Sequence, residues 1–155
     1  MQENFERDLM ILLHDVARQL RTRVDRAARC HGMTRAQWLI LARLARQPGM
    51  SQNELATICE VEPITIGRLV DRLEARGLVE RRPDPADRRI RRLHLLPAAQ
   101  STLSEITDYR KALNEEIATG LAVVEHEALI DALLHIKSNL AAEGLNSVKS
   151  AAVAG

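Results

Sequence analysis

The chain has 155 residues and a formal net charge of +1, with 46% apolar and 28% charged residues, which is the profile of a single globular domain. Aromatic residues make up only 2%, so the core must consist of Leu, Ile, Val and Ala, which suits packed helices better than a β-sandwich. No apolar run approaches the roughly 18 residues of a membrane span, and the acidic-leaning start MQENFERD has no basic region of a signal peptide. We therefore expect a cytoplasmic protein with no membrane partner.

The two cysteines, Cys30 and Cys59, belong to no CxxC or CxxH pair. They therefore indicate neither a disulfide framework nor a zinc site. Asp84 and Asp87 lack a third acidic residue at the spacing of a calcium loop. We expect no bound metal and no cofactor.

The small net charge hides an uneven distribution along the chain. Residues 68–92 carry nine arginines against five acidic residues, a local balance of +4. Residues 97–155 carry four basic residues against eight acidic ones, a balance of −4. Because charges more than about 10 Å apart are screened in physiological salt, a nearly neutral protein can still present one basic face to phosphates.

A long helix is predicted over residues 5–30, where apolar residues recur at spacings of three and four. This period of about 3.5 residues is typical of helices that pack along their length, and Gly32 is expected to end the helix. A second helix is predicted over 35–46, with Thr34 as its N-cap and the turn at residues 47–49 as its end.

Two shorter helices follow, joined by a turn of three to four residues. Ser51 opens the third helix, and Glu54 completes an S-x-x-E capping box. Pro63 begins the fourth helix, because its missing N–H costs nothing in the first turn, and Gly77 supplies the C-cap. This pair of helices is typical of a helix-turn-helix.

Two strands are predicted over 78–82 and 90–95, and PDPADRR between them reads as an exposed hairpin loop. A basic hairpin directly after a helix-turn-helix is a wing. Pro97 begins a further helical region that is expected to break near Gly120, and a final helix includes residues 129–140. The fold class is therefore mainly α with a small β wing.

Four segments in the middle of the chain occur together: SQNELA at 51–56, RLVDRLE at 68–74, RGLVER at 76–81 and the wing turn DRR at 87–89. In this order and at these separations they resemble the multiple antibiotic resistance regulator (MarR) family of winged helix-turn-helix regulators. The resemblance implies a single MarR-like domain over 1–155. Within it we expect the DNA-binding part over 33–97, dimerisation helices over 5–30 and 98–143, and a frayed tail over 144–155.

The resemblance also implies a homodimer whose first and last two helices interlock, which agrees with the apolar seams in residues 10–27 and 129–140. Most members of the family repress transcription, and small ligands, often phenolic or aromatic acids, release them from DNA. The expected partners are double-stranded DNA, a second copy of the chain and a small effector.

The fourth helix is expected to enter the major groove, which is just wide enough for an α-helix. Its apolar positions face the body of the domain, and the resemblance supports its first turns as DNA-proximal. The alternative is an ordinary solvated arginine face. The expected base-proximal residues are Pro63, Ile64, Thr65 and Arg68, and the residues expected near phosphates are Arg72 and Arg76.

The wing and the third helix supply further expected contacts. Gln52 can hydrogen-bond a phosphate, which a helix N-terminus also favours, although an ordinary first-turn position is the alternative. By the resemblance, Arg89 enters the minor groove, where a narrow A·T-rich tract has enhanced negative potential, and Asp87 holds it in place. The expected backbone contacts of the wing are Arg82, Arg88 and Arg91.

Three residues, Met10, His14 and Trp38, are candidates for the ligand crevice that the resemblance implies. The alternatives are a core position for Trp38 and an exposed helix position for His14. Cys30 or Cys59 would make the protein a redox-sensing repressor, as in the peroxide-sensing branch of the family. That branch, however, has its cysteine early in the first helix, where this chain has Met10.

Enzymes and protein-interaction modules are the rival classes. Ser51, His94 and Asp87 could form a triad, but capping explains Ser51, and the sequence has no glycine-rich phosphate loop or nucleophile elbow. A winged-helix interaction module is disfavoured, because protein interfaces have hydrophobic centres with few charges. We expect no catalytic site, and a ligand-responsive repressor that binds an inverted-repeat operator as a homodimer.

Overall fold

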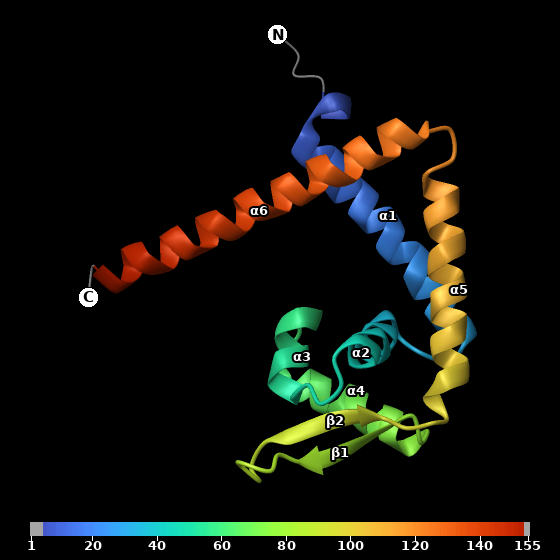
Figure 1. Cartoon of the computed structure of the whole chain (residues 1–155), viewed down its shortest axis with the longest axis vertical. Coiled ribbons are helices and arrows are strands. Elements are labelled where there is room, and N and C mark those ends of the chain that lie inside the picture. Colours follow the sequence, from blue (N-terminus) through green and yellow to red (C-terminus); the bar gives the residue numbers. More distant parts are fainter. Residues whose placement is uncertain (1–4, 154–155) are drawn as a thin grey trace. The chain divides into compact units, whose positions relative to one another are not determined.

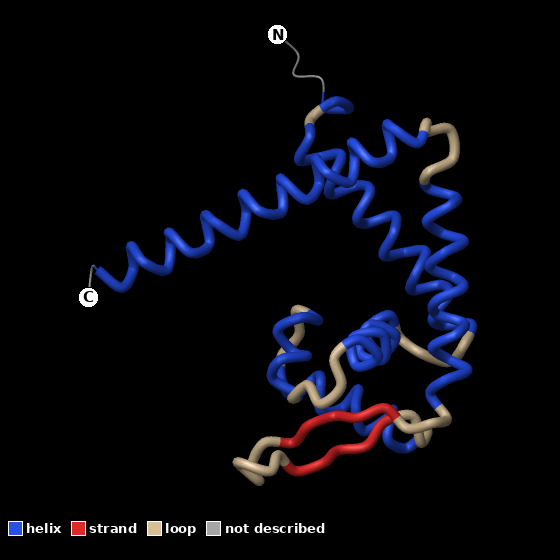
Figure 2. Tube along the Cα trace, in the orientation of Figure 1, coloured by secondary structure: helices blue, strands red, loops and turns tan. Residues whose placement is uncertain are grey.

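The structure, a computed structural model, describes the backbone of residues 5–153 and the side chains of residues 6–141. The chain divides into two compact units, Met1–Arg110 and Lys111–Gly155, which are described separately. The elements appear in chain order in Figures 1 and 2. They are a short 3-10 helix (Phe5–Arg7), α1 (Leu9–Cys30), α2 (Arg35–Arg46), α3 (Gln52–Cys59), α4 (Pro63–Ala75), β1 (Val79–Pro83), β2 (Arg91–Leu95), α5 (Ala99–Ile117) and α6 (Val123–Val153). The predicted class, mainly α with a small β wing, is confirmed.

Local capping signals decide where the helices of the first unit begin. At α3 the Ser51 hydroxyl accepts a hydrogen bond from the Glu54 N–H (3.2 Å), and the Glu54 carboxylate accepts one from the Ser51 N–H (2.6 Å). Thr34 and Gln37 form the same reciprocal pair at α2. Both predicted caps are therefore confirmed. The first helix begins at Leu9 rather than at residue 5, because the Asp8 carboxylate caps it by accepting from the Ile11 N–H (3.0 Å).

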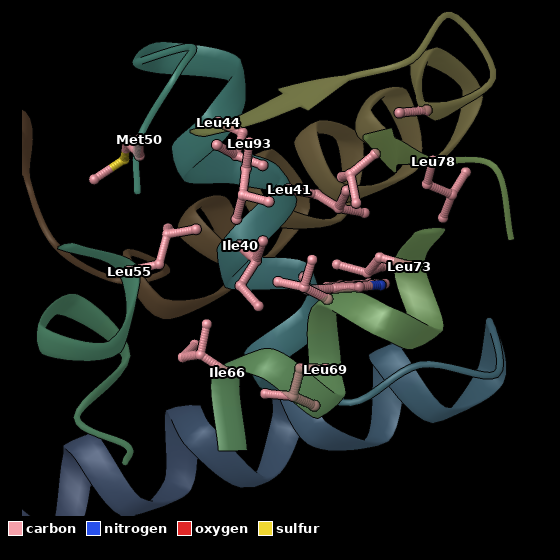
Figure 3. Packing of buried hydrophobic residues seen from close by; sticks show 14 of the residues in the cluster. Ile40, Leu41, Leu44, Met50, Leu55, Ile66, Leu69, Leu73, Leu78 and Leu93 are labelled. Carbon is pink, nitrogen blue, oxygen red and sulfur yellow. The ribbon is translucent and has the colours of Figure 1, made fainter. Parts of the chain in front are cut away.

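The core of the first unit lies between α2, α3, α4 and the hairpin (Figure 3). On α4 the buried side chains are spaced by three, one and three residues, so they line one face of the helix. The predicted inward face of α4 is confirmed. On α2, Ile40 is fully buried and Leu39 is half-buried. Burial of each large aliphatic side chain is worth about 1.5–3 kcal/mol. The largest fully buried side chains are Ile40, Leu41, Leu44, Leu55, Ile66, Val70, Leu73, Val79 and Leu93.

The two strands pair antiparallel, with Val79 opposite Leu95 and Pro83 opposite Arg91. Each strand therefore starts one residue later than the sequence predicts, and Ile90 instead closes the loop at the tip. The segment before α3 pairs with β2, since the Gly49 N–H donates to the Leu93 carbonyl (3.0 Å) and the Leu93 N–H to the Met50 carbonyl (2.9 Å). These bonds attach the hairpin directly to the start of α3.

Gly49 has the left-handed backbone that this connection requires. Its φ is +79°, and a Cβ there would lie 3.4 Å from Cε1 of His94. Any other residue would therefore be strained at this point. A glycine between α2 and α3 thus helps to set the position of the wing.

The second unit contains the end of α5 and the long helix α6. The predicted break near Gly120 is confirmed, because α5 ends at Ile117 and α6 begins at Val123. The sequence predicts a tail that frays from Gly144, whereas α6 continues to Val153; residues 154–155 lie outside the described part of the chain. Among the helices that the structure describes, none combines the length and apolar composition that a bilayer crossing requires.

Candidate nucleic-acid interface

The outer face of α4 carries all of the helix's predicted DNA-proximal residues. Pro63, Ile64, Thr65, Arg68 and Arg72 are exposed, and Ile64 is 68% exposed. Opposite them, the buried side of the helix packs into the core. No side chain in the described residues binds the guanidinium of Arg68 or Arg72. At 1.5 Å of rise per residue the two arginines lie about 6 Å apart along the helix, which leaves two free cations one turn apart.

Arg76 was expected near phosphates, but it has a different role in the structure. Its guanidinium donates to the backbone carbonyls of His31 and Gly32 at 3.3 to 3.4 Å. Arg76 therefore ties the end of α4 to the turn between α1 and α2. The spacing of four residues places Arg76 on the same helix face as Arg72, but in the fold the carbonyls of His31 and Gly32 lie close enough to accept hydrogen bonds from Arg76.

Arg81, on β1, joins three elements of the interface, a role that no pattern in the sequence predicts. Its Nε donates to the Gln52 side-chain oxygen on α3 (2.7 Å), and its Nη2 donates to the Gly67 carbonyl (3.1 Å) and Asp71 (2.7 Å) on α4. Its Nη1 donates to Glu74, which also accepts from the Arg81 backbone N–H (3.0 Å). The Arg81 side chain is 21% exposed.

Asp84 organises the wing loop. Its carboxylate accepts hydrogen bonds from the backbone N–H groups of Ala86 (2.8 Å) and Asp87 (3.0 Å) and from the guanidinium of Arg92. Arg92 also donates to the Gly49 carbonyl (2.9 Å), so the loop is linked to the start of α3. The bond from Arg92, followed by those from the two N–H groups, lowers the pKa of the Asp84 carboxyl below its usual value.

Asp87 supports Arg89, but through the backbone. The Asp87 carboxylate accepts from the Arg89 N–H (3.0 Å), which leaves the guanidinium of Arg89 unbound among the described residues. Arg88 and Arg89 are both exposed at the tip of the hairpin. Arg82 is exposed as well, but its guanidinium donates to Glu80 on the same strand, so its charge is partly neutralised.

A shallow cavity of about 220 Å³ separates the wing from the start of α3. The first turn of α3 offers backbone N–H groups here, and the wing offers arginines. This arrangement suits an anion such as a backbone phosphate. The cavity is lined by Ser51, Gln52, Asn53, Arg89, Ile90 and Arg91.

Several solved structures similar to this chain are those of transcription regulators. Residues 31–90 match the sequence profile described as the MarR family. The crystal structure of the transcriptional regulator PA3341 has 34% sequence identity and a TM-score of 0.76, over 86% of this chain and 98% of that one. The chain belongs to the MarR family. The structure of MarR itself has 26% identity and a TM-score of 0.78, over 91% of this chain and 96% of that one. A probable transcriptional regulator from Pseudomonas aeruginosa has 27% identity and a TM-score of 0.70, over 86% and 99%.

Membership in the MarR family confirms the resemblance and gives the chain the fold of a DNA-binding transcription regulator. The family consists of regulators, which are generally not enzymes. No group of three metal-binding side chains occurs in the part of the chain that the structure describes.

The three crevice candidates of this MarR-family chain do not lie together within the subunit. Trp38 is 4% exposed, and its ring lies 5.5 Å from that of His31 and 5.8 Å from that of Tyr109. Met10 and His14 are exposed near the other end of α1. Because His14 lies sixteen positions before Cys30, where α1 ends, about 24 Å of helix lies between His14 and that end.

The cysteines differ in their surroundings. Cys30 is exposed at the end of α1, and Cys59 is half-buried at the end of α3. Burial raises the pKa of the Cys59 thiol, although Arg43 and Arg35 act in the opposite direction. A raised pKa leaves less of the reactive thiolate at neutral pH, which does not favour Cys59 as an oxidation sensor.

Proposed function

We propose that this MarR-family protein is a cytoplasmic transcriptional repressor that binds an inverted-repeat operator as a homodimer and is released by a small effector. The observation that supports this function is a set of exposed arginines on two adjacent elements, whose guanidinium groups no side chain of residues 6–141 binds: Arg68 and Arg72 on α4, and Arg88 and Arg89 on the wing. An α-helix fits the major groove, whereas an arginine at a hairpin tip suits the narrower minor groove. Arg68 would read base edges, and the other three would hold the DNA backbone or the minor groove.

The homodimer is supported by the apolar side chains that each unit exposes. In α1, Leu9 is 60% exposed and Met10 is 65% exposed. In α6, Val123 is 80% and Leu140 is 67% exposed. Apolar stripes of this kind on a soluble regulator mark an association surface, and two-fold symmetry would set half-sites about ten base pairs apart, centre to centre.

An aromatic or phenolic acid is the effector class that the family resemblance implies. Trp38 fits such a role in one respect: its indole Nε1–H is buried and has no hydrogen-bond acceptor among the described residues. An acid that bound beside it would supply an acceptor.

The test is fluorescence anisotropy with labelled duplexes from the region upstream of the protein's own coding sequence. Wild type should bind one of them, and Arg89→Ala should weaken binding to every duplex and lower the salt slope by about one, because the lost contact is electrostatic. Arg46→Ala is the control, since Arg46 is exposed at the end of α2 and is neither a proposed DNA contact nor part of the dimerisation helices. If wild type binds no duplex, or if Arg89→Ala changes neither affinity nor slope, the proposed mode of binding is wrong.

A further inference from the structure

Arg81 lies in the most arginine-rich part of the chain, but it differs from the exposed arginines around it in the number of hydrogen bonds that its side chain makes within the protein. A guanidinium has five N–H donors, and the side chain of Arg81 makes four hydrogen bonds within the protein. Two carboxylates, Asp71 and Glu74, face it, so the local charge is one positive against two negative. Arg81 is therefore a poor ligand for a DNA phosphate, in contrast to Arg68 and Arg89.

The same four bonds connect β1, the strand that leads into the wing loop, to α3 and α4. Arg81 donates hydrogen bonds to Gly67 and Asp71 on α4, which flank Arg68 in the sequence. Through its own backbone on β1 it fixes the strand that leads into the wing loop. The planar guanidinium sets the direction of each bond, so the position of the wing relative to α4 depends on it.

Arg81 also orients Gln52, the expected phosphate contact on α3. The side-chain oxygen of Gln52 accepts from Arg81 Nε (2.7 Å), so the amide is held with its NH₂ group on the other side. An amide can donate to a phosphate only through this NH₂ group. Without Arg81 the Gln52 amide would rotate freely and would have to be ordered again when DNA binds.

We propose that Arg81 is a positioning residue for DNA binding: it fixes the wing and the Gln52 amide relative to α4 and does not itself contact DNA. This role rests on the DNA-binding function proposed above. It assigns to two acidic residues on the DNA-facing side, Asp71 and Glu74, the task of holding Arg81.

The test is a double-mutant cycle between Arg81→Lys and Arg89→Ala, with affinity for the operator measured by anisotropy. Lysine keeps the positive charge but cannot make the four directed bonds. Arg81→Lys alone should lower affinity about 5- to 30-fold, and it should cost much less in the Arg89→Ala background, because the minor-groove contact that depends on the position of the wing is then already absent. Arg46→Lys is the matched control and should change nothing, because Arg46 is exposed at the end of α2 and is neither a proposed DNA contact nor part of the dimerisation helices. If the two losses multiply independently, or if Arg81→Lys binds like wild type, the positioning role is overturned.

A second variant distinguishes positioning from simple electrostatics by the sign of the effect. Glu74→Ala removes a negative charge near the DNA, so Coulomb repulsion alone predicts tighter binding. Loss of positioning predicts weaker binding, since Glu74 holds both the guanidinium and the backbone N–H of Arg81. Tighter binding of Glu74→Ala overturns the proposal. If Arg81→Lys is not properly folded, as judged by a loss of cooperative unfolding, the Glu74→Ala variant alone tests the positioning role. A wild type that binds no duplex would instead refute the DNA-binding function itself.

Discussion

Replacing Arg68 with alanine should cost about ten- to a hundredfold in operator affinity. Arg68 lies in the second turn of α4, is exposed, and has a guanidinium that no side chain in the described residues binds. Its removal therefore breaks no side-chain hydrogen bond or ion pair among the described residues, and the change in affinity reports a contact with DNA. A bidentate pair from arginine to O6 and N7 of guanine is worth about 1–3 kcal/mol of discrimination, and each 1.4 kcal/mol is about a factor of ten.

The assay is selection of bound sequences from a random pool with wild type and with Arg68→Ala. Preference should relax at one symmetric pair of positions and remain elsewhere, because the other contacts are unchanged. Binding to non-specific DNA should fall much less, since Arg72, Arg88 and Arg89 still attract the backbone. An equal loss of preference at every position would show that Arg68 only holds the backbone, and the reasoning about base readout would fail.

Three further predictions concern stability and thiol chemistry. Ser51→Ala should lower the free energy of unfolding by about 1 kcal/mol in urea titrations, because the α3 cap is lost; an unchanged midpoint would refute this. The backbone N–H of Ser51 lowers the pKa of Glu54, and Arg92 lowers that of Asp84, so both stabilise the fold above their unfolded pKa values of about 4. This stability should disappear as the pH falls through their folded values, and a melting temperature that does not fall between pH 5 and pH 3 would contradict it. Cys59 should react with iodoacetamide more slowly than exposed Cys30, because burial raises the pKa of its thiol; equal rates by mass spectrometry would count against this.

The sequence predicts those features that depend on neighbours along the chain. The caps at Thr34 and Ser51 each need only a partner three residues away, and Pro63 needs only its own ring. The apolar period of α4 likewise identifies its buried face, so the exposed position of Arg68 follows from the sequence alone.

The parts that could not be predicted depend on contacts between distant residues. Arg81 meets Gln52 across 29 positions, and Arg92 meets Gly49 across 43. These pairs exist only once the register of the hairpin is fixed, and nothing in the local sequence distinguishes Arg81 from its neighbour Arg82. One feature of the sequence does indicate such a partner: Asp71 and Glu74 are acidic residues on the helix expected to face DNA, and they need a cation nearby.

The ends of the first and last helices also differ from the sequence-based prediction. The predicted first helix begins at residue 5, whereas the carboxylate of Asp8 caps α1, which begins at Leu9. At the other end of the chain, the composition of residues 144–155 suggested fraying, whereas α6 continues to Val153. Alanine is the best helix former, and the alanines near the C-terminus favour this continuation.

Methylation protection on an operator duplex tests the central claim most directly, because dimethyl sulfate modifies guanine N7 in the major groove and adenine N3 in the minor groove. If α4 enters the major groove and the wing the minor groove of a two-fold symmetric site, guanines should be protected at symmetric positions about ten base pairs apart, centre to centre. Adenines should be protected in the flanking minor grooves, and Arg68→Ala and Arg89→Ala should remove the guanine and the adenine protection respectively. A bound complex that protects neither groove would contradict this mode of DNA binding.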